Sequence, residues 1–158
     1  MEQGDLNLLN DPLSQELLNS DIPLRLGYLG CDGTPRVTPI WFHWNGDHIV
    51  LGTPMNSPKI SAISQNPKVT VTIDGNTWPY KALQIRGIAE IETVDGLVPE
   101  YTLAAKRYLG EKAALAWMEQ ARVLFPQMVR IAIKPEWVSL IDFNKRFPKA
   151  IVAAMSAI

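Results

Sequence analysis

The stretch from Gly52 to Lys59 places two hydroxyl groups and one ammonium group around the start of a predicted helix. Thr53 follows a predicted strand, and Ser57 and Pro58 are typical of the N-cap and first turn of a helix. Backbone N–H groups at a helix N-terminus are free and carry a partial positive charge, so this position attracts phosphate. Lys59 in the first turn opposes the helix dipole unless an anion binds there. The tract fits either a phosphate site or an ordinary capped helix with a solvated lysine.

Other patterns that could support catalysis or metal binding are few. The sequence contains no G-x-S-x-G elbow, no phosphate-binding P-loop, no H-E-x-x-H and no C-x-x-C. His43 and His48 flank Asn45-Gly46, the strongest hairpin signal in the chain, and a two-residue loop would set the two imidazoles opposite each other. They could then share a metal, but the chain has no third histidine. We interpret them as a polar pair at a hairpin end, and we expect no metal.

Composition narrows the class of protein. The chain has 158 residues, with 15 lysines and arginines against 16 aspartates and glutamates, so no overall positive field exists to hold nucleic-acid phosphates. The single cysteine, Cys31, excludes an intramolecular disulfide and fits a reducing compartment. Residues 1–5 lack a signal-peptide pattern, and the apolar tract 150–158 is about half the ~20 residues of a membrane span. We expect a cytoplasmic protein with no nucleic-acid partner and no membrane partner.

The elements that position these groups follow from the hydrophobic pattern. Asp11-Pro12 and the leucines after it predict an N-terminal helix over about 11–20. Period-two alternation then predicts a three-stranded antiparallel meander over 24–28, 36–44 and 48–51. Further along, the pattern predicts a short helix from Ser57, strands over 69–73 and 81–93, a helical insert over about 95–121 with a break at Gly110, a final strand pair over 128–133 and 137–143, and a C-terminal helix over about 147–158.

This order of elements predicts a mostly β protein with peripheral helices, of the α+β class. Six or seven strands, with Gly87 marking a bulge or corner in the longest, indicate a small antiparallel barrel, either a closed or a split β-barrel, in a single domain spanning residues 1–158. The β-α-β spacing of a doubly wound nucleotide-binding fold is absent. Trp41 and Phe42 face opposite sides of one strand, so we expect one ring in the core and the other against a partner or ligand. That second ring favours a homodimer.

The chain contains an ordered set of motifs over about residues 20–143: Arg25–Leu29, Asp32–Phe42, the loop with Thr53, Ser57 and Lys59, Asn66–Val69, and the strand Leu83–Glu90, which fits V-x-V-x-G-x-A-E. This ordered set resembles the FMN-binding split-barrel flavoproteins related to pyridoxamine 5′-phosphate oxidase. The resemblance implies a homodimer with FMN, or in one branch a deazaflavin, in a groove between two barrels. It also implies composite cofactor sites made by both chains.

Position by position, the resemblance implies a set of cofactor-binding residues. A backbone run lies along the isoalloxazine ring, a second group holds the phosphate, and one further basic residue reaches the cofactor. The backbone run is Val37, Thr38, Pro39 and Ile40, the phosphate group is Thr53, Ser57 and Lys59, and the further basic residue is Lys81. No side chain is designated as a catalytic acid or base.

Two departures from the family pattern bear on the substrate. Many relatives carry arginine before the phosphate-site lysine, whereas this chain has Pro58. The true oxidases end in an arginine-containing tail that grips pyridoxamine phosphate, whereas residues 150–158 are apolar. We therefore expect a flavin-dependent oxidoreductase that is not a true pyridoxamine 5′-phosphate oxidase and acts on a small, apolar substrate. A deazaflavin-dependent reductase, a non-catalytic flavin or small-ligand binder, and a barrel without cofactor are the alternatives.

Overall fold

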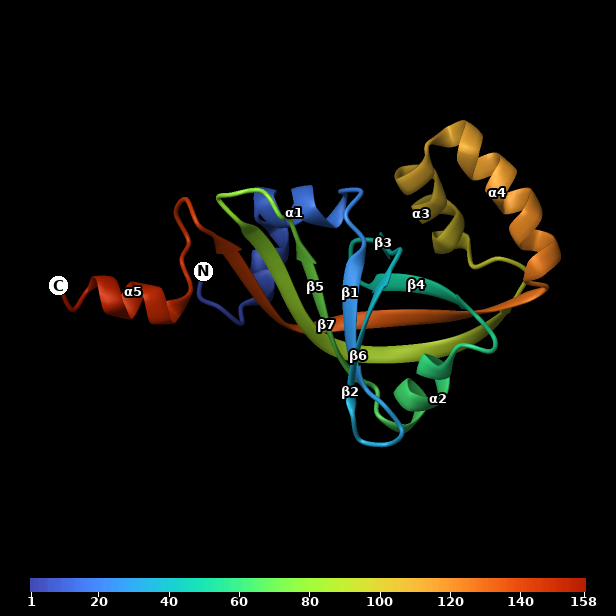
Figure 1. Cartoon of the computed structure of the whole chain (residues 1–158), viewed down its shortest axis with the longest axis horizontal. Helices are drawn as coiled ribbons and strands as arrows, with labels where there is room; N and C mark the ends of the chain where they lie inside the picture. Colours follow the sequence, from blue (N-terminus) through green and yellow to red (C-terminus); the bar gives the residue numbers. More distant parts are fainter.

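The computed structural model describes residues 1–158, and its central feature is one antiparallel sheet (Figure 1). The order of its strands is β2-β1-β5-β6-β7-β4-β3. The seven strands are β1 Leu24–Leu29, β2 Pro35–Ile40, β3 His43–Trp44, β4 Ile49–Pro54, β5 Lys68–Asp74, β6 Lys81–Asp95 and β7 Gln127–Asp142. This arrangement confirms the predicted α+β class and the antiparallel split barrel, with seven strands.

The predicted long strand over 36–44 is wrong, and with it the meander. The chain leaves the sheet after β2 and re-enters it at β3, and these two strands form the opposite edges of the sheet. The connecting residues Trp41 and Phe42 pair with no strand. Phe42 is fully buried, and its carbonyl accepts a hydrogen bond from Arg107 of the helical insert. The strand is interrupted here because the Phe42 carbonyl bonds to the Arg107 side chain and not to another strand. The local alternation of residues cannot reveal such a contact.

Gly87 marks a bulge, as its position predicts. The register between β6 and β7 shifts at Arg86 and Gly87, where Gly87 pairs with Pro135 and Arg86 pairs with Trp137. A Cβ atom at Gly87 would lie 2.3 Å from the carbonyl oxygen of Lys134, so no side chain fits. Across this bulge β7 runs unbroken, and the prediction of two strands separated by Lys134-Pro135 is wrong. A bulge accommodates a proline that regular pairing excludes.

The helices lie around the sheet, with a 3-10 turn at Leu6–Asn10 before the first of them. They are α1 Pro12–Leu18, α2 Pro58–Gln65, α3 Pro99–Leu109, α4 Glu111–Leu124 and α5 Lys149–Met155. The carboxylate of Asp11 caps α1 by accepting from the N–H of Leu13, and Gly110 separates α3 from α4. None of these helices is long and apolar enough to cross a membrane.

Two apolar clusters lie on the two faces of the sheet. Alternate residues of β4 and β7, such as Leu51 and Ile131, belong to the main core inside the barrel. Residues of opposite parity, Val50 and Met128, form a smaller cluster with Val98 at the start of the insert. The insert thus covers the outer face of β4 and β7, while Figure 1 shows α5 and both termini at the other end of the molecule.

Candidate functional site

Thr53, Ser57 and Lys59, which were predicted to bind phosphate, lie together. Thr53 is buried at the end of β4, and Ser57 is the N-cap residue of α2. The ammonium Nζ of Lys59 donates to the Ser57 hydroxyl at 2.7 Å and to the Thr53 hydroxyl at 3.4 Å. Ser57 makes no side-chain cap bond to the backbone of α2. The β4–α2 connection thus gathers one cation and two hydroxyls at a helix N-terminus.

The electrostatics of this group fit an anion. Lys59 is half-buried, and none of the chain's ion pairs involves it. Burial lowers the pKa of the Lys59 ammonium below its ordinary value, because no carboxylate offsets the loss of hydration. The partial positive charge of the α2 N-terminus adds to the same field. A phosphate group would supply the missing negative charge, so the residues present fit the phosphate of a flavin nucleotide.

The four residues predicted to line the isoalloxazine ring, Val37 to Ile40, form most of the edge strand β2. This strand pairs with β1 on one side only, so its outward backbone groups have no strand partner. Val37 is 72% exposed. Arg36, the preceding residue, lines a pocket of about 310 Å³ together with Pro58 and Ser61 of α2. The structure therefore brings the start of β2 and the start of α2 to one place.

Lys81 lies elsewhere in the same chain. Lys81 begins β6 and pairs with Asp142 of β7. Near the other end of β6, Thr93 pairs with Val129 of β7, which on its other side pairs with Thr53 of β4. The separation from residue 81 to residue 93 corresponds to roughly 40 Å of strand. The Lys81 ammonium is 3.8 Å from the carboxylate of Glu16 in α1. One copy of the chain does not bring Lys81 to the predicted phosphate-binding residues Thr53, Ser57 and Lys59.

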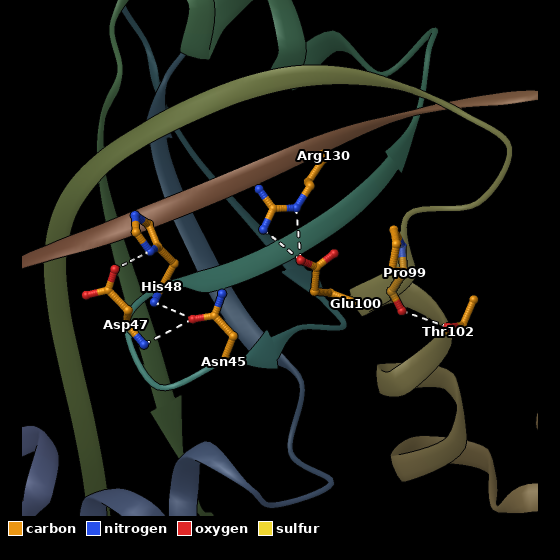
Figure 2. Close-up of polar contacts among 7 residues, drawn as sticks. All are labelled: Asn45, Asp47, His48, Pro99, Glu100, Thr102 and Arg130. Carbon is orange, nitrogen blue, oxygen red and sulfur yellow. Dashed lines mark hydrogen bonds and ion pairs between the residues drawn. The ribbon is translucent and has the colours of Figure 1, made fainter.

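The two histidines are not opposite each other, so the predicted pairing is wrong. His43 pairs with Val50, and the loop runs from Asn45 to His48 (Figure 2). The Asn45 side chain accepts from the N–H groups of Asp47 and His48, at 3.0 and 2.8 Å. Only Gly46 in this loop has a positive φ, of 98°, whereas a type I′ turn needs two such residues. The Nδ1 atom of His48 lies 2.8 Å from a carboxylate oxygen of Asp47.

The aromatic ring outside the core is covered by this chain itself. Trp41 stacks on Tyr108 of α3, with centroids 5.3 Å apart and planes 10° from parallel, and lies 5.9 Å from Tyr101. The hydroxyl of Tyr108 donates to the carbonyl of Ile22, which ties α3 to the segment before β1. Trp41 therefore needs no second subunit to cover its ring, contrary to the prediction. Local alternation over 36–44 could not show that two tyrosines of the helical insert cover this ring.

A partly buried ion pair, which no sequence pattern indicated, joins the insert to the sheet. Arg130 of β7 donates twice to one carboxylate oxygen of Glu100 in α3, at 2.6 and 3.0 Å (Figure 2). The other oxygen of Glu100 is buried without a hydrogen-bond partner. The bonds from Arg130 lower the pKa of Glu100, while burial, aided by Arg107, lowers the pKa of nearby His43. Residues thirty positions apart give no local signal of such a pair.

The largest pocket, about 650 Å³, lies on the outer face of the sheet around the bulge. Among the residues predicted to bind cofactor, only Val37 lines it. Arg36, Lys68 and Arg86 give it a basic border. The guanidinium of Arg86 lies 4.0 Å from the ring centroid of Trp137. The predicted phosphate-binding residues Thr53, Ser57 and Lys59 are therefore separate from this pocket. The exposed strand β2 lies beside both, because Val37 lines this pocket and Arg36 lies near the start of α2.

Comparison with known proteins assigns the family. The sequence model described as Pyridoxamine 5′-phosphate oxidase matches residues 11–142, most of the chain. The chain belongs to the pyridoxamine 5′-phosphate oxidase family. No match is found among curated proteins. The motifs on which the resemblance rested, from Arg25 to Glu90, lie wholly inside the matched region.

Solved structures of similar fold include several with different described roles. An F420 reductase is 24% identical with a TM-score of 0.61, over 79% of this chain and 94% of that one. An FAD-binding protein from Mesorhizobium loti is 22% identical with a TM-score of 0.54, over 80% and 88%. HutZ, a heme storage protein from Vibrio cholerae, is 16% identical with a TM-score of 0.60, over 84% and 93%. At these identities the likeness supports the split-barrel fold of this pyridoxamine 5′-phosphate oxidase family member.

Proposed function

We propose that this chain is a single FMN-binding domain and acts as a flavin-dependent oxidoreductase. The observation that carries the proposal is the Lys59 ammonium, held by two neutral hydroxyls at the start of α2 without any carboxylate partner. A charged group in this setting gains most from a phosphate. Membership of the pyridoxamine 5′-phosphate oxidase family supports a flavin as the molecule that carries this phosphate.

Each predicted residue has a physical task in this proposal. Lys59, Ser57 and Thr53 bind the phosphate, and the exposed backbone of β2 from Val37 to Ile40 orients the ring system. Bound flavin supplies the hydride or electron transfer, so the protein contributes binding, orientation and access. We assign no side chain as a catalytic acid or base, because the sequence pattern designates none.

The proposal includes a homodimer with composite cofactor sites. Because Lys81 lies at the far end of β6 from Lys59 in one chain, a site that uses both residues must take Lys81 from a second copy. The free edge of β2 and the exposed side chain of Val37 leave room for that copy beside the ring-binding strand. The support for a dimer thus comes from these residues and not from Trp41.

The substrate we propose is small and apolar, and the place of action is the cytoplasm. Residues 150–158 carry no arginine with which to bind a phosphorylated pyridoxamine, which supports an activity other than that of a true pyridoxamine 5′-phosphate oxidase. A deazaflavin-dependent reductase is the second candidate, favoured by the fold shared with an F420 reductase. A non-catalytic binder is the third, because the heme storage protein HutZ has the same fold.

The deciding experiment is reconstitution of the purified protein with each cofactor. We expect the protein to bind FMN with a flavin absorption spectrum, and the bound flavin to be reduced by a nicotinamide donor and reoxidised by an acceptor. Binding of a deazaflavin alone would select the second candidate. Tight FMN binding without turnover would select the carrier. A colourless protein that binds neither cofactor would contradict the proposal.

A further inference from the structure

A pocket of about 370 Å³ lies where Lys81 begins β6. Its walls come from α1, from the connection between β5 and β6, and from Asn144 after β7. Figure 1 shows this connection beside α1, at the end of the sheet away from the helical insert. Lys81 is the only predicted cofactor-binding residue that lines the pocket. Small-ligand sites span roughly 300–1,000 Å³, so this volume suits a molecule of one or two rings.

Trp78 supplies a flat apolar wall to this pocket. Its side chain is 65% exposed. Tyr80 packs edge-on against it, with ring centroids 5.3 Å apart and planes at 87°, and Phe143 lies 5.5 Å from it. The N–H of Phe143 donates to the Tyr80 carbonyl at 3.0 Å, which ties the β5–β6 connection to the chain after β7. The indole is thus held in place, while much of its surface stays open to a ring that stacks on it.

Two hydrogen-bond donors of the pocket have no acceptor within the chain. The Lys81 ammonium is 3.8 Å from the Glu16 carboxylate, which is beyond hydrogen-bond distance. The backbone N–H of Asn144 donates to Asp142 at 2.9 Å, whereas its side-chain amide makes no hydrogen bond to another residue. The side chain of Glu16 is 66% exposed, so a ligand can displace it. A carbonyl oxygen in the pocket would give both donors an acceptor.

The charges around the pocket favour a neutral ligand. Lys81 and Glu16 are the only charged residues that line it, and their charges cancel. Asp21 and Asp74 each precede a lining residue in the sequence, and Asp74 lies 4.0 Å from Arg25. No excess of positive charge is therefore available to bind a carboxylate or a phosphate.

We propose that this pocket binds the substrate of the flavin reaction and selects a neutral, planar carbonyl compound. The ring stacks on Trp78, the carbonyl oxygen accepts from Lys81 and Asn144, and Glu16 disfavours anionic compounds. The inference rests on the proposed function, because Lys81 lies beside a cofactor only when a second copy brings the two together. The pocket of one copy then opens toward the flavin bound by the other.

Equilibrium dialysis of the full-length protein, with and without FMN, tests the pocket with coumarin, a neutral planar lactone of two fused rings. We expect the wild type to bind coumarin at least about fivefold more tightly than coumarin-3-carboxylate, which is anionic, or naphthalene, which has no carbonyl. Trp78→Ala should weaken coumarin binding about tenfold, because the ring loses its stacking partner.

Glu16→Gln tests the charge selection separately. This variant leaves the Lys81 ammonium without a carboxylate, so it should strengthen binding of coumarin-3-carboxylate about fivefold and leave coumarin binding unchanged. The matched control is Leu115→Ala at an exposed position of α4, which should change the binding of neither compound.

The absorption of bound flavin reports whether the pocket adjoins the cofactor. Coumarin should perturb the visible spectrum of FMN bound to the wild type, and Trp78→Ala should need about tenfold more coumarin for the same change. Unaltered Tm and FMN affinity of Trp78→Ala show that the variant is folded.

The outcomes separate this inference from the proposed function. A protein that binds FMN but not coumarin overturns the inference alone, and so does coumarin binding that is equal in the wild type and Trp78→Ala. Coumarin binding that leaves the flavin spectrum unaltered also overturns it, because the pocket then lies away from the cofactor. A protein that binds no FMN contradicts the proposed function, whatever its affinity for coumarin.

Discussion

The ammonium of Lys59 lies 2.7 Å from the hydroxyl of Ser57, two residues earlier in the chain. Because Ser57 is the N-cap residue of α2, this contact places a cation where the helix already carries partial positive charge. The hydroxyl accepts from the lysine and makes no bond to the N–H groups of α2. A phosphate at this position would accept hydrogen bonds from both the Lys59 ammonium and the N–H groups at the start of α2. The first three predictions depend on this phosphate contact.

The first prediction is that the protein binds FMN more tightly than riboflavin. The two molecules differ by the phosphate, which contacts the Lys59 group, whereas the ring contacts at β2 are common to both. Titration of the apoprotein with each molecule, followed by flavin fluorescence, measures the difference. Equal dissociation constants would mean that the start of α2 binds no phosphate.

The second prediction is that Lys59→Ala weakens FMN binding about tenfold to a hundredfold. Hydrogen bonds to charged groups contribute roughly 1.5–3 kcal/mol, and the variant removes the only cation of the group. Riboflavin affinity should change little. Lys112→Ala, which removes an exposed lysine outside any ion pair on α4, is the matched control and should bind FMN normally. If the FMN dissociation constant is the same in Lys59→Ala and the wild type, the start of α2 is only a structural helix cap and does not bind the phosphate.

The third prediction concerns pH. Burial lowers the pKa of Lys59 in the free protein, whereas a bound phosphate favours the charged lysine and raises that pKa again. Binding therefore takes up a proton at pH values above the lowered pKa, and FMN affinity falls as pH rises through it. The ratio of FMN to riboflavin dissociation constants cancels any titration of the ring. This ratio should rise at alkaline pH in the wild type and stay flat in Lys59→Ala.

Local patterns revealed most of the elements but not their partners. Helix ends could be predicted because the residues that mark them, Asp11, Ser57 and Gly110, lie next to their own helices in the sequence. The strand over 36–44 was wrong because Phe42 bonds to Arg107, which lies 65 residues away. The strand pair over 128–143 was wrong because a bulge in β7, opposite Arg86 and Gly87 of β6, accommodates Pro135 within one strand. Each error involves a contact that only the fold creates.

The candidate site divides in the same way. Thr53, Ser57 and Lys59 lie within seven residues of one another, so the β4–α2 connection brings them together, as their spacing indicated. Lys81 came from family resemblance alone, and a single chain places it at the far end of β6. No sequence pattern indicated the contact between Glu100 and Arg130, because the two residues belong to separate elements, α3 and β7.

The fourth prediction is that Glu100→Gln lowers stability at neutral pH by about 1–3 kcal/mol, because it removes a partly buried charge-assisted contact. For a chain of this size each kcal/mol shifts Tm by about 2–4 °C. Arg130 lowers the pKa of Glu100 in the folded protein, so the stabilisation is present above the unfolded pKa and is lost as pH falls through the lowered folded pKa.

Thermal unfolding of both proteins across the acidic range checks this sign. The difference in Tm between the wild type and Glu100→Gln should be largest near neutral pH and shrink on acidification. Glu111→Gln, which breaks an exposed pair with Lys106 at 3.3 Å, is the control and should change Tm little at any pH. A difference in Tm that is independent of pH would assign the loss to packing and not to the ion pair.

The fifth prediction is that the protein is a homodimer in which Lys81 of one copy completes the cofactor site of the other. Light scattering on a sizing column should give twice the mass of one chain. Lys59→Ala and Lys81→Ala homodimers should each bind FMN at least about tenfold more weakly than the wild type. In a mixed dimer of the two variants, one composite site keeps both lysines and the other loses both. Half of the sites should therefore regain wild-type affinity.

A site built within one chain gives a different result in the same experiment. Every site of the mixed dimer would then lack one lysine, and no wild-type affinity would return. Lys134→Ala mixed with Lys59→Ala is the control, because Lys134 lies at the bulge of β7 and half of the sites should bind normally in either arrangement. A monomer that keeps FMN at unchanged affinity would refute both the dimer and the composite site. Because Lys81 is at the far end of β6 from Lys59, restored affinity in the mixed dimer requires that the second copy bring the two lysines to one cofactor.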